Sequence, residues 1–141
     1  MKKKKRILIV VADFYPDLAK ELLKGATTEL KKSGVEYSVV EVPGALEIPA
    51  AIAFAGKKYD GYVALGAVIR GETGHYDIVC NESARGLSEL ALTKKLAIAN
   101  GILTVENLAQ AKERASVKGG NKGGFAAKTV LQMMQIKEKF K

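Results

Sequence analysis

The sequence predicts an α/β protein of the flavodoxin-like class, a three-layer α/β/α fold with a four-stranded parallel sheet. Four continuous apolar runs alternate with stretches in which apolar residues recur at helical spacing. Continuous apolar runs are typical of strands that are covered on both faces. Strand–helix alternation with right-handed crossovers then gives a doubly wound sheet.

The first half of the domain is predicted to contain two strands, Ile7–Ala12 and Val35–Val42, and two helices, one from Pro16 to Ser33-Gly34 and a short one over Ala45–Gly56. Pro16 suits the first position of a helix, because its fixed φ is helical and its missing N–H is not needed there. Pro49 lies in the first turn of the short helix, where the missing N–H costs little.

The second half is predicted to contain two strands, Gly61–Ile69 and Leu96–Val105, and three helices, from Asp77 to about Lys95, Glu106–Ala115 and Phe125–Phe140. A glycine inside a strand often marks a bend, so we expect the fourth strand to be bent or bulged at Asn100-Gly101. Residues Lys118–Gly124 are predicted to form a glycine-rich loop.

The 141 residues divide into a basic tail, residues 1–6, and a single domain, residues 7–141. The net charge is +8, and five positive charges lie in Lys2–Arg6, which leaves an excess of three for the domain. The other lysines are spaced along the helices, so we expect no nucleic-acid partner. Binding of nucleic acid through the tail would be salt-dependent and would vanish when the tail is deleted. The remaining excess still suits small anionic substrates.

Composition also bears on the compartment. No apolar run approaches the roughly 20 residues that cross a bilayer, so no membrane association is expected. The N-terminal apolar run ends at Asp13 and is too short for a signal peptide. Because Cys80 is the only cysteine, we expect no disulfide and a cytoplasmic protein.

Ligands of doubly wound folds bind beyond the carboxyl ends of the strands. His75, the only histidine, lies there, in a segment with Thr73 and two glycines that allow close approach of a ligand. Imidazole exchanges protons near neutral pH, and the start of the next helix offers free N–H groups to an anion. These residues are typical of an anion site with a proton-transfer group, and equally of a surface histidine in a helix cap.

Three other features stand in strand-to-helix positions or near the glycine-rich loop. Arg114 and Lys122 could hold a phosphate, or form a solvated helix end. Phe14, beside Tyr15, could stack on a flat heterocycle or pack in the core. Glu47 could accept hydrogen bonds from sugar hydroxyls or cap a helix. One histidine and one cysteine do not supply a typical metal site, so no metal is expected.

The segments "PGALEIPAA", "ALGAVIRGETGHYD" and "LTVENLAQAKERASVKGGNKG", in this order, resemble the lumazine synthases. The resemblance covers almost the whole domain. It implies a transferase of the penultimate step of riboflavin biosynthesis that condenses 5-amino-6-(D-ribitylamino)uracil with 3,4-dihydroxy-2-butanone 4-phosphate. The products are 6,7-dimethyl-8-ribityllumazine, phosphate and water, and no cofactor is needed.

The resemblance also implies the roles of individual residues. His75 matches the proton-transfer residue. The pyrimidine and its ribityl chain would be bound by Phe14, Ala45, Leu46, Glu47, Val68, Ile69, Asn100 and Lys122, and the phosphate by Glu72, Thr73 and Arg114. The family forms homopentamers, in some members a 60-subunit capsid. Each site is shared between two subunits, so Arg114 and Lys122 would come from the neighbour.

The sequence departs from the family pattern at a few positions. Asn100 stands where many members carry a phenylalanine that packs on the ring, so substrate affinity could be weaker. Gly74 replaces a common proline, Tyr15 a common asparagine and Asp13 a common arginine. Two other functions fit the same scaffold, a flavin- or lumazine-binding protein without catalysis and a structural shell protein. The binding protein would not need His75, Arg114 and Lys122 together.

Overall fold

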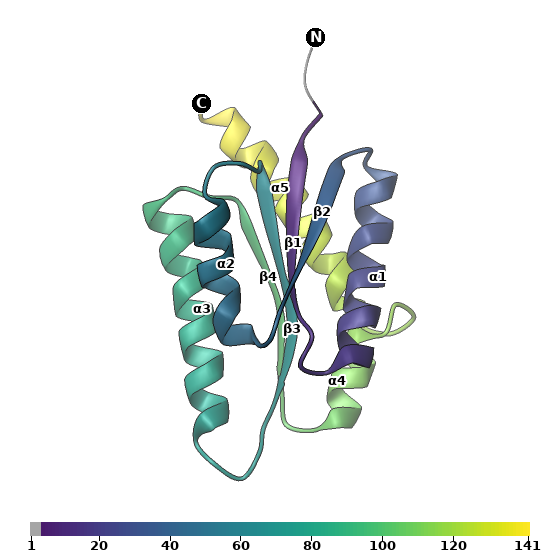
Figure 1. Ribbon diagram of the computed structural model, residues 1–141. Helices are drawn as coiled ribbons and strands as arrows, with labels where there is room; N and C mark the ends of the chain where they lie inside the picture. Colours follow the sequence, from purple (N-terminus) through teal and green to yellow (C-terminus); the bar gives the residue numbers. More distant parts are fainter. Residues whose placement is uncertain (1–3) are drawn as a thin grey trace.

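The computed structural model describes residues 4–141 and contains one parallel sheet of four strands (Figure 1). The strands are β1 (Arg6–Ala12), β2 (Glu36–Val42), β3 (Gly61–Ile69) and β4 (Ile98–Val105), in the order β2-β1-β3-β4. This arrangement confirms the predicted α/β fold class and the number and direction of the strands. Of the basic tail, residues 1–3 lie outside the described residues, and Arg6 already pairs with Glu36 in the sheet.

Two layers of helices cover the sheet (Figure 1). One layer contains α1 (Pro16–Lys32), α4 (Leu108–Ala115) and α5 (Lys122–Lys139); the other contains α2 (Ile48–Ala55), preceded by a 3-10 turn at Ala45–Glu47, and α3 (His75–Thr93). Successive residues of β1 pack on opposite layers: Ile9 contacts the α1 side and Val10 the α2 side. Since both faces of the strand are buried, its sequence is apolar throughout rather than alternating.

The glycine-rich segment is shorter as a loop than predicted, because α5 begins at Lys122 rather than at Phe125. Asn121 caps the helix: its side-chain oxygen accepts a hydrogen bond from the N–H of Gly124 at 3.3 Å. A Cβ on Gly123 would overlap the carbonyl oxygen of Leu22 in α1. The glycine at position 123 is therefore explained by the close packing of α5 on α1, which outweighs its weak helix propensity.

Other boundaries differ from the predicted ones for local reasons. β4 pairs with β3 without interruption from Ile98 to Val105, so the bulge predicted at Asn100-Gly101 is wrong. Gly101 instead lies in a tight space, where a Cβ would come within 2.8 Å of the Leu65 side chain. α4 begins two residues later than predicted, since the side chain of Asn107 caps it by accepting from the N–H of Gln110 at 2.9 Å.

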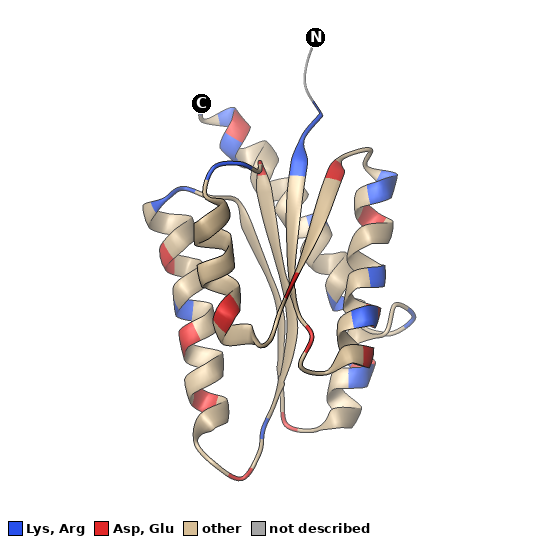
Figure 2. Ribbon diagram, viewed as in Figure 1, with Lys and Arg blue, Asp and Glu red and all other residues tan. Residues whose placement is uncertain are grey.

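Lysines are spaced along the helices, and Figure 2 shows positive residues also in the last turns of α1 and α5. Lys31 and Lys32 close α1, and Lys137 and Lys139 close α5. Positive charge at a helix C-terminus is favourable because of the helix macrodipole. Within residues 4–141, no helix has the length and apolar character that crossing a membrane requires.

Candidate active site

A pocket of about 500 Å³ opens at the carboxyl ends of β1, β2 and β3. It lies on the side of the sheet covered by α2 and α3, between the loops that follow these strands and the first turn of α3. Eight of the predicted site residues line it: Phe14, Ala45, Leu46, Glu47, Val68, Ile69, Thr73 and His75. The parallel sheet brings them together because it places the ends of successive strands at one edge.

Phe14 forms an exposed wall of this pocket, with 70% of its surface accessible. Its ring meets the ring of Tyr15 edge-on, at 4.9 Å between centroids and 77° between planes. Tyr15 is half-buried and packs on the core beneath α1. Of the two predicted alternatives, packing in the core therefore describes Tyr15, whereas the face of the Phe14 ring is available to a flat ligand.

Glu47 ends the 3-10 turn that leads into α2. Its N–H donates to the carbonyl of Gly44 at 3.1 Å, which fixes the turn. The residue stands at the N-cap position of α2, yet its side chain makes no capping hydrogen bond and is exposed. Glu47 thus stands at the predicted helix N-terminus without a capping hydrogen bond, and its carboxylate can accept hydrogen bonds from a ligand that enters the pocket.

His75 is the first residue of α3, two residues before the predicted start at Asp77. Its backbone N–H donates to the hydroxyl oxygen of Thr73 at 3.3 Å. Its side chain is exposed and lines the pocket. The imidazole therefore lies beside the free N–H groups of a helix N-terminus, where negative charge is favoured.

Arg114 and Lys122 line a separate hollow of about 410 Å³ on the other side of the sheet. This hollow lies along β4, between the last turn of α4 and the first turn of α5, and it shares no lining residue with the His75 pocket. Lys122 extends over the ring of Phe125, with its ammonium 5.6 Å from the centroid. One chain thus holds ten of the twelve predicted residues in two groups on opposite faces.

Glu72 and Asn100 line neither hollow. Glu72 is exposed in the loop between β3 and α3. The side-chain oxygen of Asn100 accepts a hydrogen bond from the N–H of Ile102 at 3.0 Å, on the open edge of the sheet formed by β4. Asn100 therefore satisfies a backbone donor of its own edge strand.

Sequence reasoning missed two aromatic residues. Tyr76 lines the His75 pocket, and Phe125, which is 63% exposed, lines the second hollow. Burial, and next a hydrogen bond with Cys80, raise the pKa of the Tyr76 phenol above its ordinary value. Tyr76 directly follows His75, and this adjacency was the only signal in the sequence.

Comparisons with known proteins show the family of the chain. The family model described as 6,7-dimethyl-8-ribityllumazine synthase matches residues 4–138. The chain belongs to this family. A 6,7-dimethyl-8-ribityllumazine synthase of Bartonella tribocorum is 57% identical over 143 residues, covering 99% of this chain and 95% of its own. The synthase 1 of Rhizobium meliloti is 56% identical over 140 residues, covering 94% and 92%.

Membership in the family makes the chain an enzyme of riboflavin biosynthesis with 6,7-dimethyl-8-ribityllumazine synthase activity. A solved structure described as a putative lipoprotein fragment from Peptoclostridium difficile 630 superposes with a TM-score of 0.54. It covers 93% of this chain and 99% of its own, at 16% identity. That likeness supports the fold and nothing more.

Proposed function

We propose that the chain condenses 5-amino-6-(D-ribitylamino)uracil with 3,4-dihydroxy-2-butanone 4-phosphate at a site that a second copy of the chain completes. The separation of the predicted residues into two hollows carries this proposal. His75 and Phe14 lie in one hollow and Arg114 and Lys122 in the other, on the opposite face of the sheet. A homopentamer that joins the hollow of one subunit to that of the next would unite them, and further assembly into a 60-subunit capsid is compatible with it.

In this proposal the His75 pocket receives the aminopyrimidine. The exposed face of Phe14 stacks on the heterocycle, and the carboxylate of Glu47 accepts hydrogen bonds from the ribityl hydroxyls. Ala45 and Leu46 line the ribityl part of the pocket, and the backbone of Val68 and Ile69, at the end of β3, contacts the ring.

The second substrate is held by its phosphate. The planar guanidinium of Arg114 from the neighbouring subunit can bind phosphate bidentately, and Lys122 contacts the carbonyl end of the pyrimidine. Thr73 and Glu72 belong to the loop before α3, where helix N–H groups favour an anion. Asn100, also from the neighbour, takes the position beside the ring.

The chemistry consists of addition of the amine to the ketone, loss of phosphate and water, and ring closure. In the proposal His75, which lines the pocket, moves protons in these steps, and such help contributes about 10²–10⁴ in rate. Holding amine and ketone together removes roughly 7–11 kcal/mol of barrier. Positioning therefore outweighs proton transfer. The proposed reaction uses no cofactor or metal, and within residues 4–141 no three His, Cys, Asp or Glu side chains gather as a metal site.

The experiment that tests the function mixes the purified protein with both substrates and follows lumazine fluorescence together with phosphate release. Equal production of both, above the uncatalysed background, supports the proposal. Tight binding of the pyrimidine without acceleration would favour the binding-protein alternative instead. Light scattering measures the assembly. We also propose a cytoplasmic location, which agrees with a chain whose single cysteine, Cys80, is free.

A further inference from the structure

Arg70 is the first residue after β3, and its side chain makes contacts on three sides. Its Nε lies 3.0 Å from both carboxylate oxygens of Glu106, the first residue after β4. A second nitrogen of the guanidinium lies 3.6 Å from the carboxylate of Asp77. The guanidinium carbon lies 4.3 Å from the centroid of the Tyr76 ring. The guanidinium is therefore fixed along its edge by carboxylates and on its face by an aromatic ring.

These contacts join the two ends of the loop that carries Thr73. The N–H of Arg70 donates to the carbonyl of Val105 at 3.0 Å, so its backbone continues the pairing of β3 with β4. Tyr76 and Asp77 belong to the first turn of α3, on the far side of the loop. One side chain thus connects the end of the sheet with the start of the helix.

The loop between these ends has little support of its own. Residues 71–74 are all exposed. A Cβ on Gly71 or Gly74 would find no atom within 4 Å. The hydrogen bond from the N–H of His75 to Thr73 is internal to the segment and does not tie it to the sheet. The N–H of Ile78 donates to the carbonyl of Gly74 at 3.3 Å, so the loop is tied to α3 at its second end. Arg70 is the side chain that links this end to the end of β3.

Arg70 does not itself line the pocket, whereas Thr73, His75 and Tyr76 do. Its side chain is 42% exposed, and exposed ion pairs contribute little to stability. We propose that Arg70 is a positioning residue, whose contacts with Glu106 and Tyr76 set where the loop presents Thr73 and His75 to the phosphate-bearing substrate. This inference rests on the proposed function of the His75 pocket.

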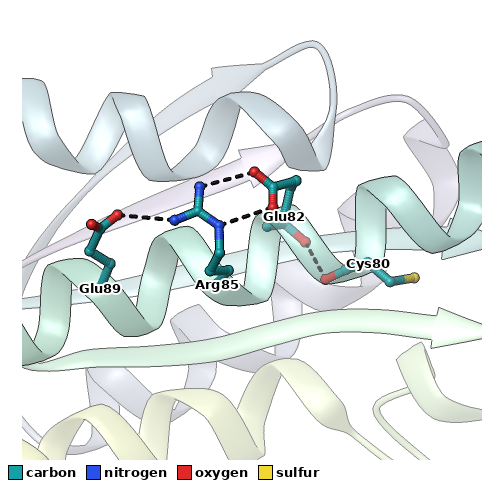
Figure 3. Close-up of polar contacts among 5 residues, drawn as sticks. Cys80, Glu82, Arg85 and Glu89 are labelled. Carbon is teal, nitrogen blue, oxygen red and sulfur yellow. Dashed lines mark hydrogen bonds and ion pairs between the residues drawn. The ribbon is translucent and has the colours of Figure 1, made fainter.

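The chain contains a matched control in Arg85, on α3 (Figure 3). Its Nε and one terminal nitrogen each lie 2.9 Å from the carboxylate of Glu82, and its other terminal nitrogen lies 3.3 Å from Glu89. The side chain is 61% exposed, and it is not among the residues that line the His75 pocket. Arg85→Gln thus removes an equivalent guanidinium–carboxylate cluster without disturbing the loop.

The experiment compares Arg70→Gln, Arg70→Lys and Glu106→Gln with Arg85→Gln, after circular dichroism and light scattering have matched fold and assembly to the wild type. For Arg70→Gln we expect kcat/KM for the butanone phosphate to fall at least about tenfold, because displacements near 1 Å cost up to about a hundredfold. Inhibition by inorganic phosphate should weaken in parallel. Binding of the lumazine product, which depends on Phe14 and Glu47, should change less than about twofold.

Arg70→Lys keeps the charge but not the planar fork, so we expect partial recovery. Glu106→Gln should repeat the defect in weaker form, and Arg85→Gln should match the wild type. If Arg70 acts through His75, the double variant Arg70→Gln/His75→Ala should be no slower than the slower of its two single variants. An Arg70→Gln enzyme that equals Arg85→Gln, or that loses product binding as strongly as phosphate binding, overturns the inference. Failure of the proposed function itself would appear separately, as an inactive wild type.

Discussion

Two variants that are each defective should restore one another if the site is shared between copies of the chain. His75→Ala removes the proposed proton-transfer group of one hollow, and Arg114→Ala removes the proposed phosphate ligand of the other. In a mixed assembly, some sites combine the intact His75 of one subunit with the intact Arg114 of its neighbour. If the two variants are present in equal amounts and placed at random, half of the subunits have an intact His75, and half of their neighbours have an intact Arg114. About a quarter of all sites are therefore complete.

The assay co-expresses the two variants with different affinity tags, isolates assemblies that carry both, and measures lumazine formation per subunit. We expect about a quarter of wild-type activity plus the residual activity of the parents. The control pairs His75→Ala with the double variant His75→Ala/Arg114→Ala, in which no site contains an intact His75. A mixed assembly no more active than the average of its parents would refute the shared site, since residues within one chain cannot be rescued by a neighbour.

The other predictions concern single substitutions. His75→Ala should slow turnover by about 10²-fold or more yet leave measurable activity, since positioning persists; complete loss with an intact assembly would contradict this ranking. Arg114→Ala should raise KM for the butanone phosphate, and an unchanged KM would remove its assigned role. Asn100→Phe should tighten pyrimidine binding, measured by fluorescence, while it unpairs the N–H of Ile102. Gly123→Ala should lower the free energy of unfolding by about 1–3 kcal/mol in urea melts, because its Cβ overlaps the backbone of α1.

The sheet and the pocket at its edge follow from local sequence patterns. A run such as Ile7–Ala12 is apolar at every position because β1 is buried on both faces, and this is visible in the sequence. Strand ends that share one edge then bring Phe14, Glu47 and His75 together without further information. These are properties of short segments and of the handedness of their connections, so sequence reasoning reaches them.

The errors arise where tertiary packing overrides local preference. Glycines favour loops, so Gly123 and Gly124 were predicted outside the helix, but both are buried in the first turn of α5. The bulge predicted at Asn100-Gly101 for the same reason is absent, and Gly101 makes room for the side chain of Leu65. The residue against which Gly123 packs, Leu22, and the residue against which Gly101 packs, Leu65, are both distant in the sequence. The apolar pattern of the glycine's own segment therefore does not reveal the contact.

The division of the site follows from the topology itself. Helices that follow successive strands must cover both faces of a doubly wound sheet, so the start of α3 and the end of α4 lie on opposite sides. His75 and Arg114, placed at these two positions, cannot meet within one chain unless the fold changes. The Arg70–Glu106 contact spans the same division, because it joins the loop before α3 to the loop before α4. A substrate that contacts both His75 and Arg114, as we propose, therefore requires association of the chains. The Arg70–Glu106 ion pair, to which we assign the positioning of His75, also lies directly before α4, the helix that carries Arg114.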